Sequence, residues 1–362
     1  MTTEIDRDKL DKFNFKVWTY KKGEMVSVMI TIGDRLGLYK AMQGEGPLSS
    51  ADLATRTGLN ERFVREWLLG QAAAGLIDTD DDATHFELSP EQAAVLADEE
   101  RSISFAAGAF RGGFSPETVE AILESFRSGI GITYEQQGED RAEGLARMTA
   151  PTSRHALTSD ILPSLDGVHE KLQQGATVVD VGCGAGVTLV TIAAAYPQSR
   201  CIGYDPSSTA VRLAQQRANE EGVTNVEFVA AGAEDLPADL NADLILTFDC
   251  MHDMAFPDVA ARAIRQTIAD DGTWLLKDIR STGSFRKDMR NPLLAMFYGF
   301  SLTSCLQSAM SEPGGMGLGT LGLHAQAAEQ LVTEAGFGSF TAHDFNDKAN
   351  LYYEVRVGEP VT

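Results

Sequence analysis

One segment restricts the possible folds of this sequence more than any other. In it, an apolar stretch typical of a buried strand leads directly into three closely spaced glycines. The stretch reads Val178-Val-Asp-Val-Gly-Cys-Gly-Ala-Gly186. Glycine lets a backbone approach a ligand closely, and the free N–H groups of a helix that starts beyond the turn can bind a polar or anionic group. A dinucleotide-binding turn has the spacing GxGxxG, which fails here at Val187, and again at Leu189 when counted from Gly184. The segment therefore predicts a ligand site of another class or, as the structural alternative, a tight turn without a ligand.

From residue 176 onward, short apolar runs alternate with helical segments. Such an alternation is typical of a parallel sheet that helices cover on both faces. Two further apolar runs near the end of the chain are close enough in sequence to pair antiparallel. The expected strands are 176–181, 201–204, 226–229, 244–248, 273–276, 340–345 and 351–357, and the expected helices between them are 187–196, 207–221 and 258–269.

Ionisable side chains follow two of these expected strands. The second strand ends at Asp205, which can accept hydrogen bonds from both ribose hydroxyls of a nucleoside or simply cap the following helix. The fourth strand is followed by His252-Asp253. Because the carboxyl ends of parallel strands line the crevice in which ligands bind, we expect this pair at the mouth of the site. A neutral imidazole, titrating near about pH 6.5, suits a general base, whereas the alternative is a His252 that caps the helix near Pro257.

The glycine-rich turn, with Asp180 two residues before it and Asp205 19 residues after it, resembles motifs I and II of the class I S-adenosylmethionine-dependent methyltransferases. The His252-Asp253 pair resembles that of small-molecule O-methyltransferases, in which the His is the base that deprotonates the acceptor hydroxyl. The resemblance implies an α/β, Rossmann-like class I methyltransferase domain with a seven-stranded, mostly parallel sheet of order 3-2-1-4-5-7-6. It also implies S-adenosyl-L-methionine as the cofactor.

The resemblance assigns the remaining site residues, with two departures from the family pattern. Relatives often carry Gly-Asp-Ala-Glu after the third strand, with the Asp on the adenine amino group. Gly232 stands at that position here, so Glu234 or the backbone around Ala233 would make the contact. Relatives continue His-Asp-Trp, where this chain has Met254. The expected catalytic residues are His252 and Asp253, and the expected cofactor-binding residues are Asp180, Gly182, Gly184, Gly186, Asp205, Ala233, Glu234 and Asp249.

Methyl transfer from a sulfonium requires mainly that the acceptor is held in line with the methyl group and that water is excluded. A base is needed only when the acceptor carries a proton. A basic His252 therefore predicts an O–H, N–H or S–H acceptor, with oxygen favoured by the family resemblance. We expect the acceptor to be a small, partly apolar molecule.

Residues 281–322 form an insertion at the place where relatives carry substrate-binding segments. Residues 291–306 are apolar nearly all round, so they either line an acceptor pocket or pack into a dimer partner. Residues 313–322 contain five glycines and form either a mobile lid or a plain connection. The expected acceptor-side residues, supported by position alone, are Arg111, Tyr134, Met251 and Phe297; no His, Cys and carboxylate spacing predicts a metal site.

Residues 1–100 follow the order helix, turn, helix and hairpin, which is that of a winged-helix domain. A helical stripe at its start comprises Met25, Val28, Met29, Ile32 and Leu36, and the buried face of the helix after Asn60 is expected to comprise Phe63, Val64, Trp67 and Leu68. Residues 101–175 are expected to be connecting helices that cover the site, and residues 176–362 the methyltransferase domain.

A winged helix also suggests a transcriptional regulator, but the charge argues against nucleic-acid binding. The chain has 30 basic and 52 acidic residues, a net charge of −22, and residues 1–100 contain 11 basic against 19 acidic residues. Asp78 and Asp80–Asp82 occupy the expected wing, and Glu61 and Glu66 balance Arg62 and Arg65 on the expected recognition helix. The family resemblance instead implies that this domain forms a homodimer. A non-catalytic S-adenosylmethionine-binding protein remains a further alternative.

The expected cellular location depends on whether the sequence contains membrane-spanning or signal segments. No apolar run approaches the roughly 20 residues of a membrane-spanning helix, and the first residues contain no apolar signal core. Four widely separated cysteines read as reduced thiols. We therefore expect a cytoplasmic protein that does not associate with membranes.

Overall fold

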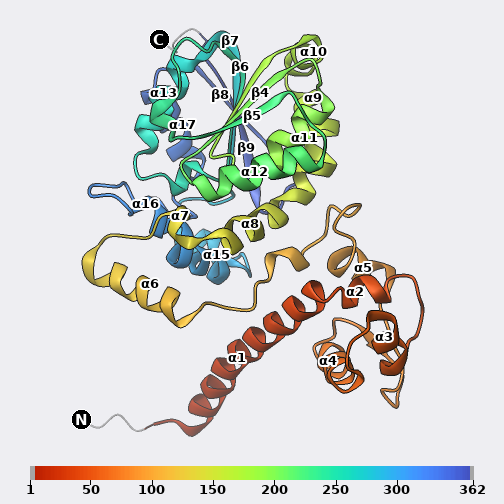
Figure 1. The fold of residues 1–362 in the computed structure, drawn as a ribbon. Coiled ribbons are helices and arrows are strands. Elements are labelled where there is room, and N and C mark those ends of the chain that lie inside the picture. The colour runs from red at the N-terminus through yellow and green to blue at the C-terminus, as the bar shows by residue number, and fades with distance from the viewer. Residues whose placement is uncertain (1–4, 359–362) are drawn as a thin grey trace. The chain divides into compact units, whose positions relative to one another are not determined.

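The computed structural model describes residues 5–358, which divide into two compact units, one up to Phe114 and the other from Ser115 onward (Figure 1). Residues 101–114, expected among the connecting helices, thus belong to the first unit. The reason is that Phe105 and Ala107 are buried in its apolar core. Within the described part of the chain, no helix is both long and apolar enough to cross a membrane.

The first unit has the expected winged-helix order of elements. Ser49 and Asp52 form a capping box at the start of α3, and Asn60 caps α4. The two-stranded wing pairs Asp78 with Glu87. The elements are α1 (Arg7–Arg35), α2 (Leu38–Met42), α3 (Ser50–Thr57), α4 (Glu61–Ala73), β1 (Asp78–Thr79), β2 (Phe86–Glu87), α5 (Pro90–Leu96) and the 3₁₀ turn η1 (Ala107–Ala109).

The buried residues of this unit differ from the predicted apolar patterns in two helices. Val64, Trp67 and Leu68 are buried as predicted, but Phe63 is 79% exposed because it lies at the edge of the buried face of α4. In α1 the predicted stripe does not form the buried face: Met25, Ile32 and Leu36 are exposed, and Ile30, Thr31 and Gly33 are buried instead. The cause is a close backbone approach, in which Trp67 Nε1 donates to the carbonyl of Met29 (2.9 Å).

The second unit contains a seven-stranded sheet of order β5-β4-β3-β6-β7-β9-β8, which confirms the predicted order. Strands β3 to β7 run parallel, and β9 pairs antiparallel with both β7 and β8. The strands are β3 (Thr177–Val181), β4 (Arg200–Asp205), β5 (Val226–Ala230), β6 (Ala242–Phe248), β7 (Ile268–Ile279), β8 (Ser339–His343) and β9 (Asn350–Arg356).

Helices cover both faces of this sheet (Figure 1). Successive residues of β3 point to opposite faces, so Val178 joins a core with α10 (Val168–Gln174) and α11 (Val187–Ala195). Val179 joins the core on the other face, which contains α13 (Pro257–Thr267) and α17 (Ala325–Glu334). Helix α12 (Ser208–Glu220) contacts β5 and α11.

Two further groups of helices belong to the second unit. The first precedes the sheet: α6 (Pro116–Ser128), α7 (Tyr134–Gln137), α8 (Glu139–Thr152), the π-helical segment η2 (Ser153–Ile161) and α9 (Leu162–Ser164). The second is the insertion: α14 (Phe285–Asp288), α15 (Leu294–Phe300), the π-helical segment η5 (Ser301–Cys305) and α16 (Leu306–Ala309). Ala146 and Ala150 of α8 pack on Ala185 and Val187 of the glycine-rich turn.

Candidate active site

The glycine-rich turn links β3 to α11, and its three glycines have left-handed backbones. Their φ angles are +75° at Gly182, +53° at Gly184 and +78° at Gly186, a region that favours glycine. A Cβ at Gly182 would lie 2.8 Å from Cys250 Sγ, and one at Gly186 would lie 2.7 Å from the Cβ of Ala214. A Cβ at Gly184 would meet no atom within 4 Å. Gly182 and Gly186 therefore fit against protein, whereas Gly184 faces open space.

Asp205 lies at the end of β4 beside this turn. Its Oδ2 accepts a hydrogen bond from the N–H of Gly184 (2.9 Å), and its Oδ1 accepts one from the N–H of Ser207 (2.9 Å). Burial raises the pKa of Asp205, while these two N–H donors act in the opposite direction. The acid and the turn that the sequence predicts at the cofactor site are thus brought together.

Asp180 lies in β3, two residues before Gly182, and is buried. Burial, together with the nearby charge of Asp205, raises the pKa of Asp180 to about 7. Its carboxyl group is therefore divided between the neutral and ionised forms near neutral pH.

The segment after β5 forms a short 3₁₀ turn, η3 (Ala233–Asp235). Ala233 is buried in the apolar core. The Glu234 carboxylate folds back over Gly232, into the space that a side chain at position 232 would occupy. A carboxylate therefore lies beside the position where relatives carry Asp, although it comes from two residues further along the chain.

Asp249 follows β6 with a left-handed backbone, φ +55°. One carboxylate oxygen pairs with Lys277 Nζ (2.5 Å), and the other accepts a hydrogen bond from the side-chain amide of Asn350. The side chain thus ties the end of β6 to β7 and β9. A cofactor contact for Asp249 stays a prediction.

His252 lies in the 3₁₀ turn η4 (Met251–Asp253) between two carboxylates. Its Nδ1 is 2.7 Å from Asp278 Oδ1, and its Nε2 is 3.1 Å from Asp253 Oδ1. Burial alone lowers the pKa of His252, but the two carboxylates outweigh it and raise the pKa well above its ordinary value. The imidazolium in turn outweighs burial at Asp253 and lowers its pKa.

The geometry decides against His252 as a helix cap. Helix α13 begins at Pro257, its N-cap residue is Phe256, and no side chain caps it. Both ring nitrogens of His252 face carboxylates of η4 and β7 instead. The residue therefore belongs to an ionisable cluster at the carboxyl ends of β6 and β7.

Tyr134 is the predicted acceptor-side residue that contacts this cluster. Its hydroxyl donates to Asp253 Oδ2 (2.5 Å), and burial raises its pKa well above the ordinary value, so it stays a donor. Phe297 is buried in α15, and Met251 is fully buried in the core that α13 covers. Arg111 belongs to the first unit, which does not contain the sheet.

Asp278 and Cys305 were not predicted from the sequence. Asp278 lies one residue beyond Lys277 at the end of an apolar strand, and two charged residues there were a usable signal. Cys305 comes from the insertion, 52 positions from Asp253 in the numbering, and no spacing links it to the site.

Among the described residues, one group has the atom types of a metal site. Single ligand atoms of His252, Asp253 and Cys305 all lie within 4.8 Å of one another. His252 would have to lose its Nε2 proton before it could bind a metal, and the two neighbouring carboxylates favour the protonated ring. Burial also raises the pKa of the Cys305 thiol, which disfavours the thiolate that binds metals.

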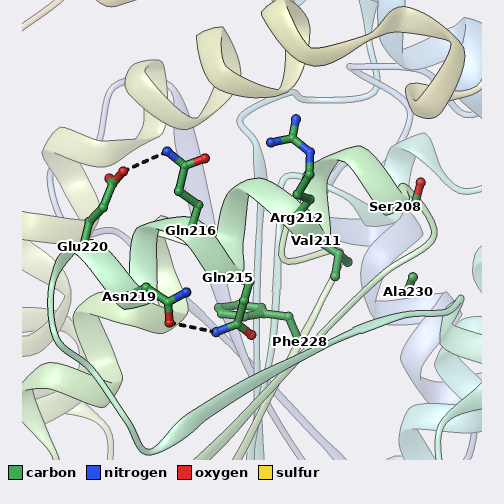
Figure 2. Close-up of a pocket in the computed structure, with 9 residues that line it drawn as sticks. All are labelled: Ser208, Val211, Arg212, Gln215, Gln216, Asn219, Glu220, Phe228 and Ala230. Carbon is green, nitrogen blue, oxygen red and sulfur yellow. Dashed lines mark hydrogen bonds between the residues drawn. The ribbon is translucent and has the colours of Figure 1, made fainter.

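A hollow of about 660 Å³ lies between α12 and β5. Figure 2 shows the side chains that line it. Most of the residues that line it are polar residues of α12, and two pairs of them are hydrogen-bonded, Gln215 with Asn219 and Gln216 with Glu220. The residues that line it include none of the predicted site residues. It is a surface feature separate from the ionisable cluster.

Comparison with known proteins identifies two regions of the chain. Residues 172–313 match the family described as methyltransferase domain, and residues 24–98 match the Rv2258c-like winged HTH domain. The uncharacterized methyltransferase YcgJ of Bacillus subtilis is 36% identical over 102 residues, which are 28% of this chain and 40% of that protein. The uncharacterized protein RP028 of Rickettsia prowazekii is 32% identical over 72 residues, 20% of this chain and 29% of that protein. The chain thus covers less than half the length of these curated relatives.

Solved structures with the same fold cover nearly the whole chain. A putative O-methyltransferase from Nostoc punctiforme has a TM-score of 0.70 at 18% identity, covering 96% of this chain and 98% of its own. Human N-acetylserotonin methyltransferase, solved in complex with SAM, has a TM-score of 0.67 at 18% identity, covering 99% and 100%. The mitomycin 7-O-methyltransferase MmcR has a TM-score of 0.67 at 18% identity, covering 97% and 99%. Residues 172–313 are therefore a methyltransferase domain and residues 24–98 a winged-helix domain, and the whole chain has the fold of these solved structures.

Proposed function

We propose that this protein transfers a methyl group from S-adenosylmethionine to an oxygen of a small, partly apolar acceptor, with His252 as the base. The observation that carries the proposal is the buried His252, held between Asp253 and Asp278 at the carboxyl ends of β6 and β7. The glycine-rich turn and Asp205 lie at the ends of the neighbouring strands β3 and β4. A cofactor-binding turn and a proton acceptor thus share one edge of the sheet.

The residues around the turn fit the cofactor. The space over Gly184 allows close approach to the backbone. Asp205 supplies a carboxylate for the ribose hydroxyls, and Glu234 or the Ala233 backbone supplies the adenine contact. When bound, S-adenosylmethionine supplies an electrophilic methyl group on a positively charged sulfur. The mitomycin 7-O-methyltransferase and the putative O-methyltransferase of Nostoc punctiforme, both similar in fold, support oxygen as the acceptor atom.

The two carboxylates assign separate tasks to the nitrogens of His252. Asp278 holds Nδ1 and fixes the orientation of the ring, so Nε2, which faces Asp253 Oδ1 at 3.1 Å, is the nitrogen that would take the proton of the acceptor hydroxyl. Because both carboxylates stabilise the imidazolium, the ring must first lose its own proton to solvent. Neutral His252 is then a strong base, and Asp253 stabilises the positive charge that forms on it.

The dimer is part of the proposal. Aromatic side chains of α1 are well exposed, for example Phe13 and Trp18, at 65% and 63%. The arginines of α4 pair with acids of the same helix, Arg62 with Glu66 (2.5 Å) and Arg65 with Glu61 (3.2 Å). These features support a second copy of the chain rather than nucleic acid as the partner of the first unit. The four free cysteines fit a cytoplasmic location.

The test combines binding and turnover. We expect S-adenosylmethionine to bind in calorimetry, and labelled methyl transfer to be detectable with members of a panel of small phenols and alcohols. Replacing His252→Ala should reduce turnover by roughly 10²–10⁴-fold and leave cofactor affinity unchanged. The matched control is His343→Ala, which removes a histidine paired with Glu354 (2.9 Å) between β8 and β9. Nearly full turnover in the His252→Ala variant would show that His252 has a structural role and is not the base.

A further inference from the structure

Helix α7 is a single short turn whose adjacent residues reach two different parts of the site. It lies between Gly131 and Gly138, and its two ends are held by other segments. The N–H of Gly131 donates to the carbonyl of Met310 (2.9 Å), and Ser304 Oγ donates to Gln137 Oε1 (2.9 Å). A Cβ at position 131 would collide with the carbonyl of Gln307. The segment is therefore fitted closely against the insertion.

Glu135 caps α12, the helix that starts directly after Asp205. Its carboxylate accepts four hydrogen bonds, from Ser207 Oγ (2.6 Å), Ser208 Oγ (3.0 Å), the N–H of Thr209 (3.1 Å) and Thr209 Oγ1 (3.0 Å). These donors lower the pKa of Glu135 to about 2. An ionised carboxylate from another segment thus occupies the positive end of α12.

The same donors continue to the glycine-rich turn. Ser207, which donates to Glu135 through its hydroxyl, donates its N–H to Asp205 Oδ1 (2.9 Å). The other oxygen of Asp205 accepts from the N–H of Gly184 (2.9 Å). An unbroken series of hydrogen bonds therefore joins the predicted cofactor turn to Glu135.

Tyr134, the preceding residue, reaches the catalytic cluster. Its hydroxyl donates to Asp253 Oδ2, whose partner oxygen faces His252 Nε2 at 3.1 Å. Ser304 Oγ lies 3.4 Å from the same hydroxyl. A shift of α7 would consequently move the donor on Asp253 and change the carboxylate that stabilises His252.

We propose that Glu135 is a positioning residue, which couples cofactor binding at the turn to the arrangement of Asp253 through the adjacent Tyr134. The inference rests on the proposed function, because the ligand that it invokes is the cofactor. Occupation of the Asp205 site fixes the start of α12, Glu135 fixes α7 on that helix, and Tyr134 then fixes Asp253. Filling of the cofactor site should therefore stabilise the arrangement of the acceptor site.

Hydrogen exchange tests this coupling without knowledge of the acceptor. The probe is S-adenosylhomocysteine, added to the full chain and to variants Glu135→Gln and Tyr134→Phe. In the unsubstituted protein we expect slower exchange at residues 182–187 and 205–210, and also at 249–256 and 301–310, by about 5-fold or more. In both variants the protection at the turn should persist, and that at 249–256 and 301–310 should disappear.

The matched control is Glu139→Gln, which removes another exposed carboxylate paired with α12, through Arg212 (2.5 Å), without touching the cap. It should keep the full protection pattern. Distant protection that persists in Glu135→Gln and Tyr134→Phe would overturn the coupling while leaving the proposed function intact. Absence of protection at 182–187 in the unsubstituted protein would overturn both. The Tyr134→Phe variant tests the idea even if Glu135→Gln does not fold.

Discussion

At the scale of single residues, the charge on His252 is set by its two neighbours. A buried histidine without partners would stay neutral, but Asp253 and Asp278 raise its pKa well above the ordinary value. A base that must lose a proton before it can act gives a rate that rises with pH through its own pKa. The pH profile of turnover therefore reports directly on this pair of carboxylates.

Asp278→Asn should move that profile. The change removes one negative charge at 2.7 Å from Nδ1, so the pKa of His252 falls and the rising limb of kcat/KM shifts to lower pH. Methyl transfer measured across the pH range checks this. Asp344→Asn, which breaks the exposed pair with Arg280 (2.9 Å), should leave the limb in place. An unmoved limb in Asp278→Asn would show that His252 does not control it.

Asp180→Asn should stabilise the protein without ligand, and more so at alkaline pH. The pKa of Asp180 is about 7 in the folded chain and near 3.8 when exposed, so the folded state holds the proton more tightly. Stability is then lost as the pH rises from about 4 to about 7, a loss that Asn avoids. The gain in Tm should be larger at about pH 8 than at about pH 5. A gain that shrinks with pH would contradict the assignment.

At the scale of elements, the three glycines of the turn have different tasks. Gly186→Ala would set a Cβ 2.7 Å from Ala214 on a left-handed backbone, and should cost about 1–3 kcal/mol of unfolding free energy. Gly184→Ala meets no neighbour and should cost only about 1–2 kcal/mol of backbone strain. It should nevertheless weaken cofactor binding, because its Cβ occupies the open side of the turn. Urea unfolding and calorimetry separate the two effects, and equal binding in both variants would contradict this division.

The elements predicted best from sequence are those whose signal is local. Most strands of the sheet follow their apolar runs, as 226–229 against Val226–Ala230 illustrates, whereas β7 (Ile268–Ile279) extends well beyond the expected 273–276. The glycine-rich turn carries its own spacing. Phe63 was predicted to be buried and is exposed, because an apolar side chain in a helix is not necessarily buried within its own unit.

The contacts of the site that the sequence did not predict join distant segments. Tyr134 and Asp253 are 119 residues apart, and Glu135 and Ser207 are 72 apart. A carboxylate that caps a helix in another segment leaves no pattern in its own neighbourhood. Only the fold of the chain makes Glu135 a candidate positioning residue.

At the scale of the whole molecule, acidity and exposed aromatic side chains occur together in the first unit. Its wing carries Asp80, which pairs with His85 (3.1 Å). Both arginines of α4 form ion pairs with glutamates of the same helix. The described part of α1 before residue 26 is exposed throughout. This part of α1 has no packed face, and its exposed aromatic residues predict a partner that covers them.

We therefore expect light scattering after gel filtration to give the mass of a dimer at micromolar concentration. The double change Phe13→Glu and Trp18→Glu places charges on side chains that are 65% and 63% exposed, and should shift the equilibrium to monomers. Phe285→Glu, at a residue of the second unit that is 61% exposed, is the matched control and should leave the dimer intact. Because exposed aromatics contribute little to the folding of a lone chain, the double variant should keep the Tm of its methyltransferase domain. A monomeric unsubstituted protein, or a dimer that the double variant does not weaken, would mean that α1 is covered by something other than a second copy.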